Sequence, residues 1–205
     1  IAPLPQQTQS NPTVKEKGNE VNKSAETANW KIYKAAGLFS LRYPENYELI
    51  KDYDSRLCTQ CLPDAKVSIY PKKILIDGKY VNTRDYLNEL EHSPGVQISI
   101  AAFPKKEGIS LDNPRSLFGS GPLLYYDSEE LNEQAIKEII IDGVKTYEIA
   151  DVPNIGGGCC KRDKEIVTIK DSNIYQILLT FRIANNATEI EEEMNQILST
   201  FKFLP

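Results

Sequence analysis

A periodic pattern of apolar residues near the C-terminus is the clearest structural signal in the 205-residue chain. Five apolar side chains recur at steps of four, three, one and three residues, which places them on one face of a helix. They are Ile190, Met194, Ile197, Leu198 and Phe201. Thr188 followed three residues later by Glu191 has the spacing of a capping box and predicts that the helix begins at Thr188. The apolar face of such a helix requires a sheet to cover it.

Alternation of apolar and polar side chains predicts the strands of that sheet. Residues 30–33 and 38–43 alternate on either side of Gly37 and are expected to form a β-hairpin, followed by a short strand over residues 47–50. Two Asp-Gly pairs, at Asp77 and Asp142, have the chemistry of tight turns. Further strands are predicted at residues 67–69, 74–76, 96–101, 139–141, 144–149, 165–170 and 174–183, with the strand at 96–101 half buried.

Two short helices complete the predicted elements. Thr83 is expected to cap a helix running to His92, and a second helix is expected between Asp127 and Ile136. Strands joined by tight turns imply a largely antiparallel sheet, with the helices packed on it. The predicted class is therefore α+β, with one domain spanning residues 29–205.

Residues 1–28 differ from the rest of the chain in composition. Pro, Gln, Thr, Ser, Asn and scattered charges follow one another there without periodicity, which predicts a flexible polar tether, because too little apolar surface is available to offset chain entropy. The chain begins with Ile1 instead of Met, so we expect an upstream signal peptide or membrane anchor. An extracytoplasmic location, membrane-anchored or secreted, follows from that expectation.

Charge argues against one class of partner. The formal net charge is −5 and the pI is near 5.1, and the basic residues of the tether are scattered among acids. Nucleic-acid binding requires a concentrated basic surface to neutralise phosphates. We therefore expect no nucleic-acid partner. No apolar run approaches the roughly 20 residues of a membrane-spanning helix, so a membrane would be reached through a segment upstream of Ile1.

Aromatic residues at the two ends of the predicted domain could pack together. Phe39, Leu41 and Tyr43 share one face of the second strand, and Phe201 and Phe203 follow the C-terminal helix. Contact between these groups would fasten the opening hairpin to the end of the chain.

The same two ends resemble a known family. Residues 30–33 (WKIY), 39–46 (FSLRYPEN) and 197–203 (ILSTFKF) resemble the ends of small bacterial extracytoplasmic lipoproteins with a PsbP-like fold. The resemblance implies an α/β/α sandwich around a central antiparallel sheet, carried behind a membrane anchor and a tether. It also implies a non-catalytic binding or accessory role, and it supplies no ligand-binding residues.

Four cysteines are the strongest chemical pattern in the chain: Cys58, Cys61, Cys159 and Cys160. Two structural disulfides are favoured by the even count and the expected export, and bridges joining the two loops would each stabilise the fold by up to ~4.7 kcal/mol. A four-thiolate zinc site is the second interpretation, although adjacent cysteines rarely reach one tetrahedral ion. A redox-active Cys58-Cys61 pair is the third, although Pro63 follows where such motifs normally open a helix. Free thiols also remain open.

Other candidate catalytic patterns are weak. His92 is the only histidine, so any catalytic triad would depend on it, yet its place at a predicted helix end is typical of a C-terminal cation. The triple glycine at residues 156–158 lacks the lysine and following helix of a phosphate-binding loop. We therefore predict a non-enzymatic protein without metal or cofactor.

Three irregular loops, residues 56–64, 105–126 and 154–161, are the predicted binding face for an unknown protein or envelope component. Aromatic and aliphatic side chains of the middle loop are the candidate partner surface, because tyrosine is enriched at interfaces. They are Leu117, Phe118, Tyr125 and Tyr126. The sequence thus favours a membrane-tethered binding domain, with a thiol or zinc protein as the alternative.

Overall fold

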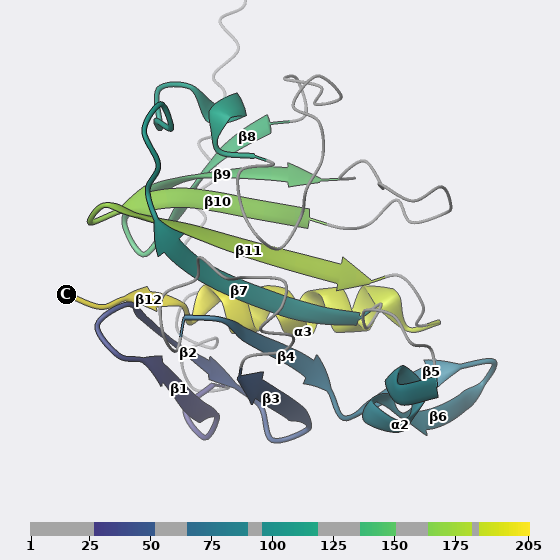
Figure 1. Ribbon diagram of the computed structural model, residues 1–205. Coiled ribbons are helices and arrows are strands. Elements are labelled where there is room, and N and C mark those ends of the chain that lie inside the picture. The colour runs from purple at the N-terminus through teal and green to yellow at the C-terminus, as the bar shows by residue number, and fades with distance from the viewer. Residues whose placement is uncertain (1–26, 52–64, 90–95, 119–135, 151–163, 182–184) are drawn as a thin grey trace, which may run out of the picture.

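The computed structural model describes residues 27–51, 65–89, 96–118, 136–150, 164–181 and 185–205 (Figure 1). The predicted tether lies outside these residues, apart from its last two positions. The described chain is rich in strands. In order, the strands are β1 (Lys31–Ala35), β2 (Phe39–Tyr43), β3 (Tyr47–Lys51), β4 (Val67–Pro71), β5 (Lys73–Ile76), β6 (Lys79–Asn82), β7 (Val96–Pro104), β8 (Ile136–Ile141), β9 (Val144–Ala150), β10 (Lys164–Lys170), β11 (Asn173–Phe181) and β12 (Lys202–Phe203).

The described residues form fewer helices than strands. They are α2 (Thr83–Glu89), α3 (Ala187–Ser199) and the 3₁₀ turn η2 (Pro114–Ser116). One sheet has seven strands in the order β3-β4-β7-β11-β10-β9-β8, a second has the order β1-β2-β12, and β5 and β6 form a separate hairpin. Every paired strand is antiparallel to its neighbour, which confirms the predicted antiparallel sheet.

The hairpins form because their turns carry residues that tolerate a positive φ. Asp142 and Gly143 join β8 to β9 with φ of 49° and 76°, and Asp171 and Ser172 join β10 to β11 with φ of 50° and 65°. Gly37, at φ 68°, lies in the connection between β1 and β2. These turns fix the local register of the strands on either side.

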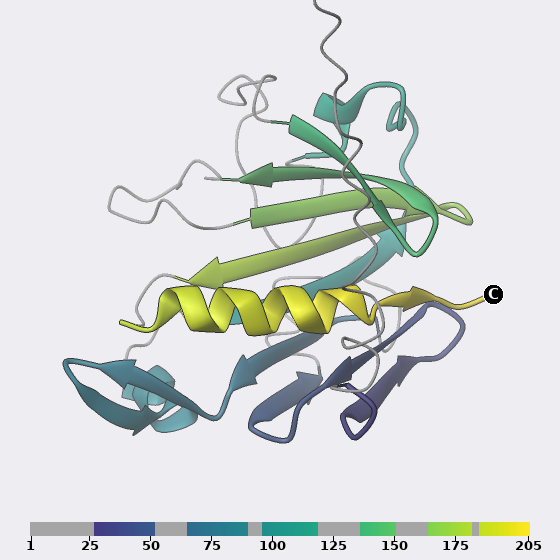
Figure 2. The same cartoon turned by 180° about the vertical axis from the view of Figure 1, so that it is seen from behind.

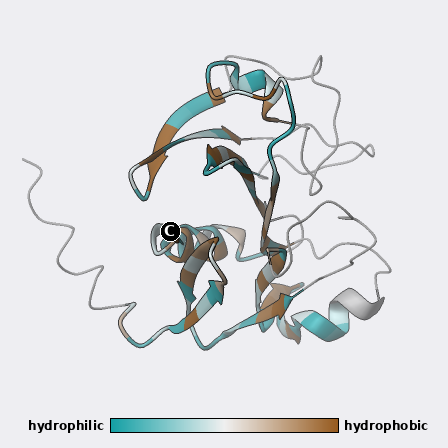
Figure 3. Cartoon of the chain, turned by 60° about the vertical axis from the view of Figure 1, so that its left-hand side comes forward, coloured by the Kyte–Doolittle hydropathy of each residue, from teal (hydrophilic) through white to brown (hydrophobic). Residues whose placement is uncertain are grey.

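The helix α3 lies along one face of the seven-stranded sheet, between that sheet and the three-stranded one (Figure 2). Its predicted apolar face is confirmed: Ile190, Met194, Ile197 and Phe201 are at most 3% exposed and belong to the larger core cluster. Hydrophobic positions lie mainly where the sheets and the helix face one another, as the hydropathy colouring in Figure 3 shows. The hydrophobic effect on this face holds the two sheets and α3 together.

The C-terminus fastens the opening hairpin, as the aromatic pattern predicts. The rings of Phe39 and Phe201 are stacked with centroids 5.2 Å apart, and Phe201 meets Phe203 edge to face at 4.9 Å. Strand β12 pairs with β2, and the backbone N–H of Arg42 donates to Thr200 Oγ1 at 2.7 Å. Both ends of the described chain therefore share one layer.

The second face of the large sheet carries a smaller core cluster. Phe103, Tyr147, Val167 and Ile174 belong to it, together with residues of the segment that follows β7. A loop and the η2 turn cover this part of the face. Among the described residues α3 packs on one face only, so the sandwich with helices on both faces is not what this part of the chain displays.

The prediction that residues 96–101 form a half-buried strand is wrong. Every residue of β7 except Pro104 is buried, including Gln97 and Ser99 at 5% and 4% exposure. Strand β7 lies between β4 and β11 in the interior of the sheet, so its side chains have those of a neighbouring strand on each side. The Ser99 hydroxyl lies 3.2 Å from that of Ser68 on β4, so these buried polar groups satisfy one another.

The N-cap residues of α2 and α3 differ from the predicted ones. Asn82 Oδ1 accepts hydrogen bonds from the N–H groups of Arg84 and Asp85, so Asn82 and not Thr83 caps α2. The N-cap of α3 is Asn186, two residues before Thr188. Local spacing therefore locates each helix but misplaces its first residue.

Candidate functional site

A groove of about 540 Å³ opens between the first turns of α3 and the β5–β6 hairpin. This volume lies within the range of about 300–1,000 Å³ usual for ligand pockets. The turn before β3 and the end of β4 complete its walls. The lining residues are Asn46, Pro71, Lys72, Lys73, Tyr80, Asn186, Glu189, Ile190 and Glu193. They come from three separate parts of the sequence.

The β5–β6 hairpin is held against α3 by backbone contacts. The N–H of Asn185 donates to the carbonyl of Leu75 at 2.8 Å, and the N–H of Leu75 donates to Asn186 Oδ1 at 3.3 Å. Because the Asn186 side chain is used in this way, it makes no cap hydrogen bond to its own helix. The N-terminus of α3 and strand β5 are thus fixed relative to one another.

The root of the hairpin is tied to the strands on the other side of the groove. The N–H of Lys72 donates to the carbonyl of Asn46 at 2.8 Å, and the N–H of Thr83 donates to the carbonyl of Lys72 at 3.0 Å. Arg84 on α2 lies 3.3 Å from the Glu48 carboxylate on β3. Both backbone groups of Lys72 and the carbonyl of Asn46 therefore already have partners within the domain.

The groove combines an apolar floor with an exposed aromatic ring. Pro71 is buried and Ile190 is 3% exposed, whereas Tyr80 is 66% exposed. Two other large hydrophobic side chains are exposed in the described residues, Ile32 on β1 and Ile140 on β8. Neither lines this groove. An exposed tyrosine beside an apolar floor is typical of a surface that buries a ligand's apolar group.

Charges of opposite sign lie along the groove. Lys72 and Lys73 are contributed by the β4–β5 junction, and Glu189 and Glu193 stand four residues apart on α3. In the described part of the chain, Lys72, Lys73 and Glu189 make no side-chain ion pair or hydrogen bond. These three charged groups are available to a ligand.

Glu193 is positioned by a buried tyrosine. The Tyr47 hydroxyl donates to Glu193 Oε2 at 2.7 Å, and Tyr47 itself is 1% exposed. Burial raises the pKa of Tyr47 far above its ordinary value of about 10, and the hydrogen bond and negative charge of Glu193 raise the pKa further. The phenol therefore stays protonated as a donor and holds the carboxylate in one orientation.

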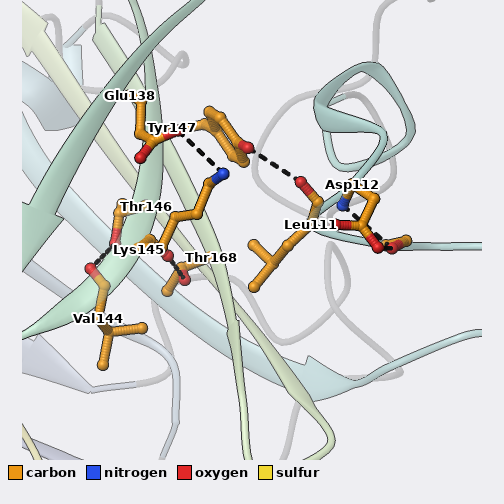
Figure 4. A network of polar contacts seen from close by, with 9 residues as sticks. Leu111, Asp112, Glu138, Val144, Lys145, Thr146, Tyr147 and Thr168 are labelled. Carbon is orange, nitrogen blue, oxygen red and sulfur yellow. Dashed lines mark hydrogen bonds and ion pairs between the residues drawn. The ribbon is translucent and has the colours of Figure 1, made fainter.

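A second polar network lies on the other side of the molecule and is structural (Figure 4). The Tyr147 hydroxyl donates to the carbonyl of Leu111 at 2.9 Å, which ties the segment after β7 to β9. Lys145 Nζ lies 2.9 Å from Glu138 and 5.2 Å from the centre of the Tyr147 ring. Hydrogen bonding to Tyr147, and to a lesser extent to Glu138, raises the pKa of Lys145. The Lys145 ammonium group therefore stays protonated.

A buried carboxylate on the second face of the sheet also has a structural partner. Glu165 on β10 and Gln176 on β11 are both fully buried, and Gln176 Nε2 donates to Glu165 Oε1 at 2.6 Å. Burial of a carboxylate is costly unless it is hydrogen-bonded. This pair lies inside the sheet face, away from the groove.

The structure places the predicted partner surface partly in the core. Leu117 and Phe118 are 1% and 2% exposed and belong to the second core cluster, so the prediction that they contact a partner is wrong for these two side chains. The reason is that the segment after β7 folds back onto Phe103 and Ile109. Tyr125 and Tyr126 lie outside the described residues.

The cysteine predictions fall outside the described part of the chain. Cys58, Cys61, Cys159 and Cys160 are not among the residues whose placement is described, and neither is His92. The disulfide, zinc and redox interpretations therefore stay predictions. Within the described residues, no three side chains of the His, Cys, Asp and Glu types gather as a metal site would require.

Sequence reasoning did not find the groove. Its strongest local signals were the Lys72-Lys73 pair directly after Pro71 and the Asp77-Gly78 turn, which is followed by the exposed Tyr80. Strand β6 carries Tyr80 and was not predicted. The other wall lies on α3, and no local pattern states that residues 72–80 and 186–193 meet.

Comparisons with known proteins define no family for this chain. No family model matches, and no curated protein matches. Among solved structures, the chain is similar to the solution structure of cyanobacterial PsbP (CyanoP) from Synechocystis sp. PCC 6803, at 12% identity and a TM-score of 0.48, over 84% of this chain and 91% of that one. Such a likeness is too distant to establish a family or a function. No helix among the described residues is long and apolar enough to cross a membrane.

Proposed function

We propose that this protein is a non-catalytic binding or accessory domain that holds a partner protein in the groove between α3 and the β5–β6 hairpin. The observation that carries the proposal is the combination of the exposed Tyr80 ring with the apolar floor at Pro71 and Ile190. Burying a tyrosine in an interface is among the contacts that contribute most to affinity.

The groove's fixed geometry supports binding. The hairpin, α3 and β3 are linked by backbone hydrogen bonds and by the Asn186 side chain, so both walls are held before any partner arrives. A preorganised site loses little conformational entropy on binding. Tyr47 in turn holds Glu193 in place.

The proposal includes a location. In keeping with the polar composition of residues 1–28, which is that of a flexible tether, the domain acts outside the cytoplasm. The groove would then face partners in the cell envelope. The partner's identity is the subject of the experiment that follows.

The test is retention of proteins from detergent-solubilised membranes of the source organism on the immobilised chain. Tyr80→Ser is expected to reduce the specifically retained proteins by about tenfold or more, because a central tyrosine contributes on the order of 2 kcal/mol to such an interface. Ile32→Ser and Ile140→Ser are matched controls, since they remove exposed hydrophobic side chains at 56% and 64% exposure away from the groove.

Two outcomes decide whether the groove is the binding site. Loss of retained proteins in the Tyr80→Ser variant, with normal retention by both control variants, supports the groove as the binding site. Retention by Tyr80→Ser equal to that of the unaltered chain, or equal losses in all three variants, would show that the groove does not hold the partner.

A further inference from the structure

Resting on the proposed function, the geometry of the groove points to the chemistry of its ligand. We infer that it binds a polypeptide segment that presents one apolar side chain between an acidic residue and a basic residue. The apolar side chain occupies the floor beside Tyr80, the acidic residue faces Lys72 and Lys73, and the basic residue faces Glu189.

The hydrogen bonding of Lys72 and Leu75 excludes one common mode of peptide recognition at this wall of the groove. An extended peptide can add a strand to a sheet only where backbone N–H and C=O groups are unpaired. Here both backbone groups of Leu75 have partners in residues 185–186, and both backbone groups of Lys72 are also paired. This wall of the groove therefore recognises a ligand through its side chains.

The floor selects for an apolar group. Ile190 is buried beneath the groove, Pro71 closes the end of β4, and the Tyr80 ring stands exposed beside them. An apolar side chain inserted here would cover the Tyr80 ring and remove its exposed surface from water. Burial of apolar area contributes about 25 cal/mol for each Å² removed from water.

The walls select for charges of both signs. The side chains of Lys72, Lys73 and Glu189 make no ion pair or hydrogen bond within the described chain. Glu193 is already engaged by Tyr47 and contributes negative charge to the same wall. A ligand with a carboxylate on one side and an ammonium or guanidinium on the other matches both walls, and like charges would be repelled.

A polypeptide fits these features better than a small zwitterion does. A free amino acid carries its two charges on one carbon atom, whereas a segment of chain can separate them on either side of an apolar side chain. Tyr80 also lies on a hairpin that projects from the end of the domain (Figure 1), where a second protein can approach.

The probe is an end-blocked glycine-rich peptide that carries one aspartate, one leucine and one lysine. Titration into the isotopically labelled full chain should shift the amide signals of Tyr80 and Ile190 in a saturable and salt-sensitive way. Replacing leucine by glycine in the peptide should weaken binding by about tenfold. Free leucine should not produce the same shifts.

Charge reversal on the protein supplies the decisive comparison. The variant Lys72→Glu, Lys73→Glu should lose affinity for the mixed-charge peptide by about tenfold and gain a similar factor for a peptide in which lysine replaces aspartate. Glu189→Lys should instead favour a peptide in which aspartate replaces lysine. Both variants change exposed side chains, and their amide spectra report whether the fold is kept.

The outcomes separate this inference from the proposed function. Specificity that follows the reversed charges supports the inference. If the amide signals of Tyr80 and Ile190 shift equally whatever the charges of the peptide and the variant, the inference is overturned, but the groove remains an apolar binding site. Equal binding of free leucine, or the absence of shifts with every peptide, also overturns the inference, while the membrane-extract experiment with Tyr80→Ser decides the proposed function independently.

Discussion

A single buried hydroxyl is the residue-scale feature with the simplest energetic consequence. Thr83 is 0% exposed, and its Oγ1 has no hydrogen-bond partner among the residues that the structure describes. A hydroxyl buried without a partner loses its hydrogen bonds to water, at a cost of about 1–3 kcal/mol. The backbone N–H of Thr83 is satisfied by Lys72, so the cost belongs to the side chain alone.

We expect Thr83→Val to stabilise the domain by about 1 kcal/mol, because valine has the same shape and no hydroxyl to desolvate. Urea unfolding at neutral pH measures the change as a higher midpoint with an unchanged slope. Thr83→Ser is the matched control, since it keeps the hydroxyl and loses the methyl group. A Val variant that is less stable than the parent would mean that the hydroxyl contributes favourably.

Asp142 is the residue whose charge links distant parts of the fold. Its carboxylate lies 2.8 Å from Lys202 Nζ and accepts a hydrogen bond from the N–H of Phe203 at 2.9 Å. Burial raises the pKa of Asp142, but the hydrogen bonds from Lys202 and Phe203 and the charges of Lys202 and Lys170 outweigh it, so the pKa is lowered. The β8–β9 turn is thereby joined to β12.

Asp142→Asn should destabilise the domain by about 1 kcal/mol at pH 7, because asparagine keeps the turn conformation and loses the charge. The folded-state pKa lies below the unfolded value of about 3.9, so the stabilisation is present above that value. It is lost as pH falls through the folded-state pKa. Urea unfolding at pH 7 and at about pH 3 should show the difference between variant and parent shrinking in acid; an equal difference at both pH values would contradict this account.

At the scale of elements, the contact between the end of α3 and the opening hairpin dominates. Phe201 is 1% exposed and touches two other rings, and it connects β2, α3 and β12. Phe201→Ala should therefore cost about 3–5 kcal/mol of unfolding free energy. Glu192→Ala, an exposed position on the same helix, should change stability by less than about 0.5 kcal/mol. A small effect at Phe201 would mean that the two ends are held by other contacts.

Secondary-structure elements could be predicted from the sequence where a short-range pattern of residues defines them. The turn pair at Asp142 and the periodicity of residues 190–201 predict a hairpin and a helix that the structure confirms. Caps were misjudged, because Asn82 and Thr83 are adjacent candidates and only the formed helix decides which side chain reaches its N–H groups. Polar residues on β7 suggested exposure, but Ser99 is buried and finds its partner, Ser68, on the neighbouring strand.

At the scale of the whole molecule, strand order and the groove depend on contacts between distant segments. Turn chemistry fixes which strands are neighbours in a hairpin, but not that β7 lies between β4 and β11. The groove needs α3, β5–β6 and the turn before β3 to meet, so its residues carry no common sequence pattern. Exposure of Tyr80 and burial of Leu117 likewise follow from the assembled fold.

The two core clusters share strands, which predicts that they unfold together. On β10, Ile166 belongs to the first cluster and Val167 to the second, because adjacent strand residues point to opposite faces. Loss of packing on one face therefore removes support for the strands that form the other. Leu117 belongs to the second cluster, whereas Trp30, the only tryptophan, packs against the first.

Leu117→Ala should thus lower the unfolding free energy by about 2–5 kcal/mol and shift the denaturant midpoints of two spectroscopic probes equally. The denaturant midpoint seen by Trp30 fluorescence and the midpoint seen by far-UV circular dichroism should fall together, as a two-state transition requires. Ser116→Ala, in the same segment and half-buried, is the control and should shift both midpoints much less. A Trp30 midpoint that stays in place while the circular dichroism midpoint falls would show that the two faces unfold separately, since the fluorescence reports only on the face covered by α3.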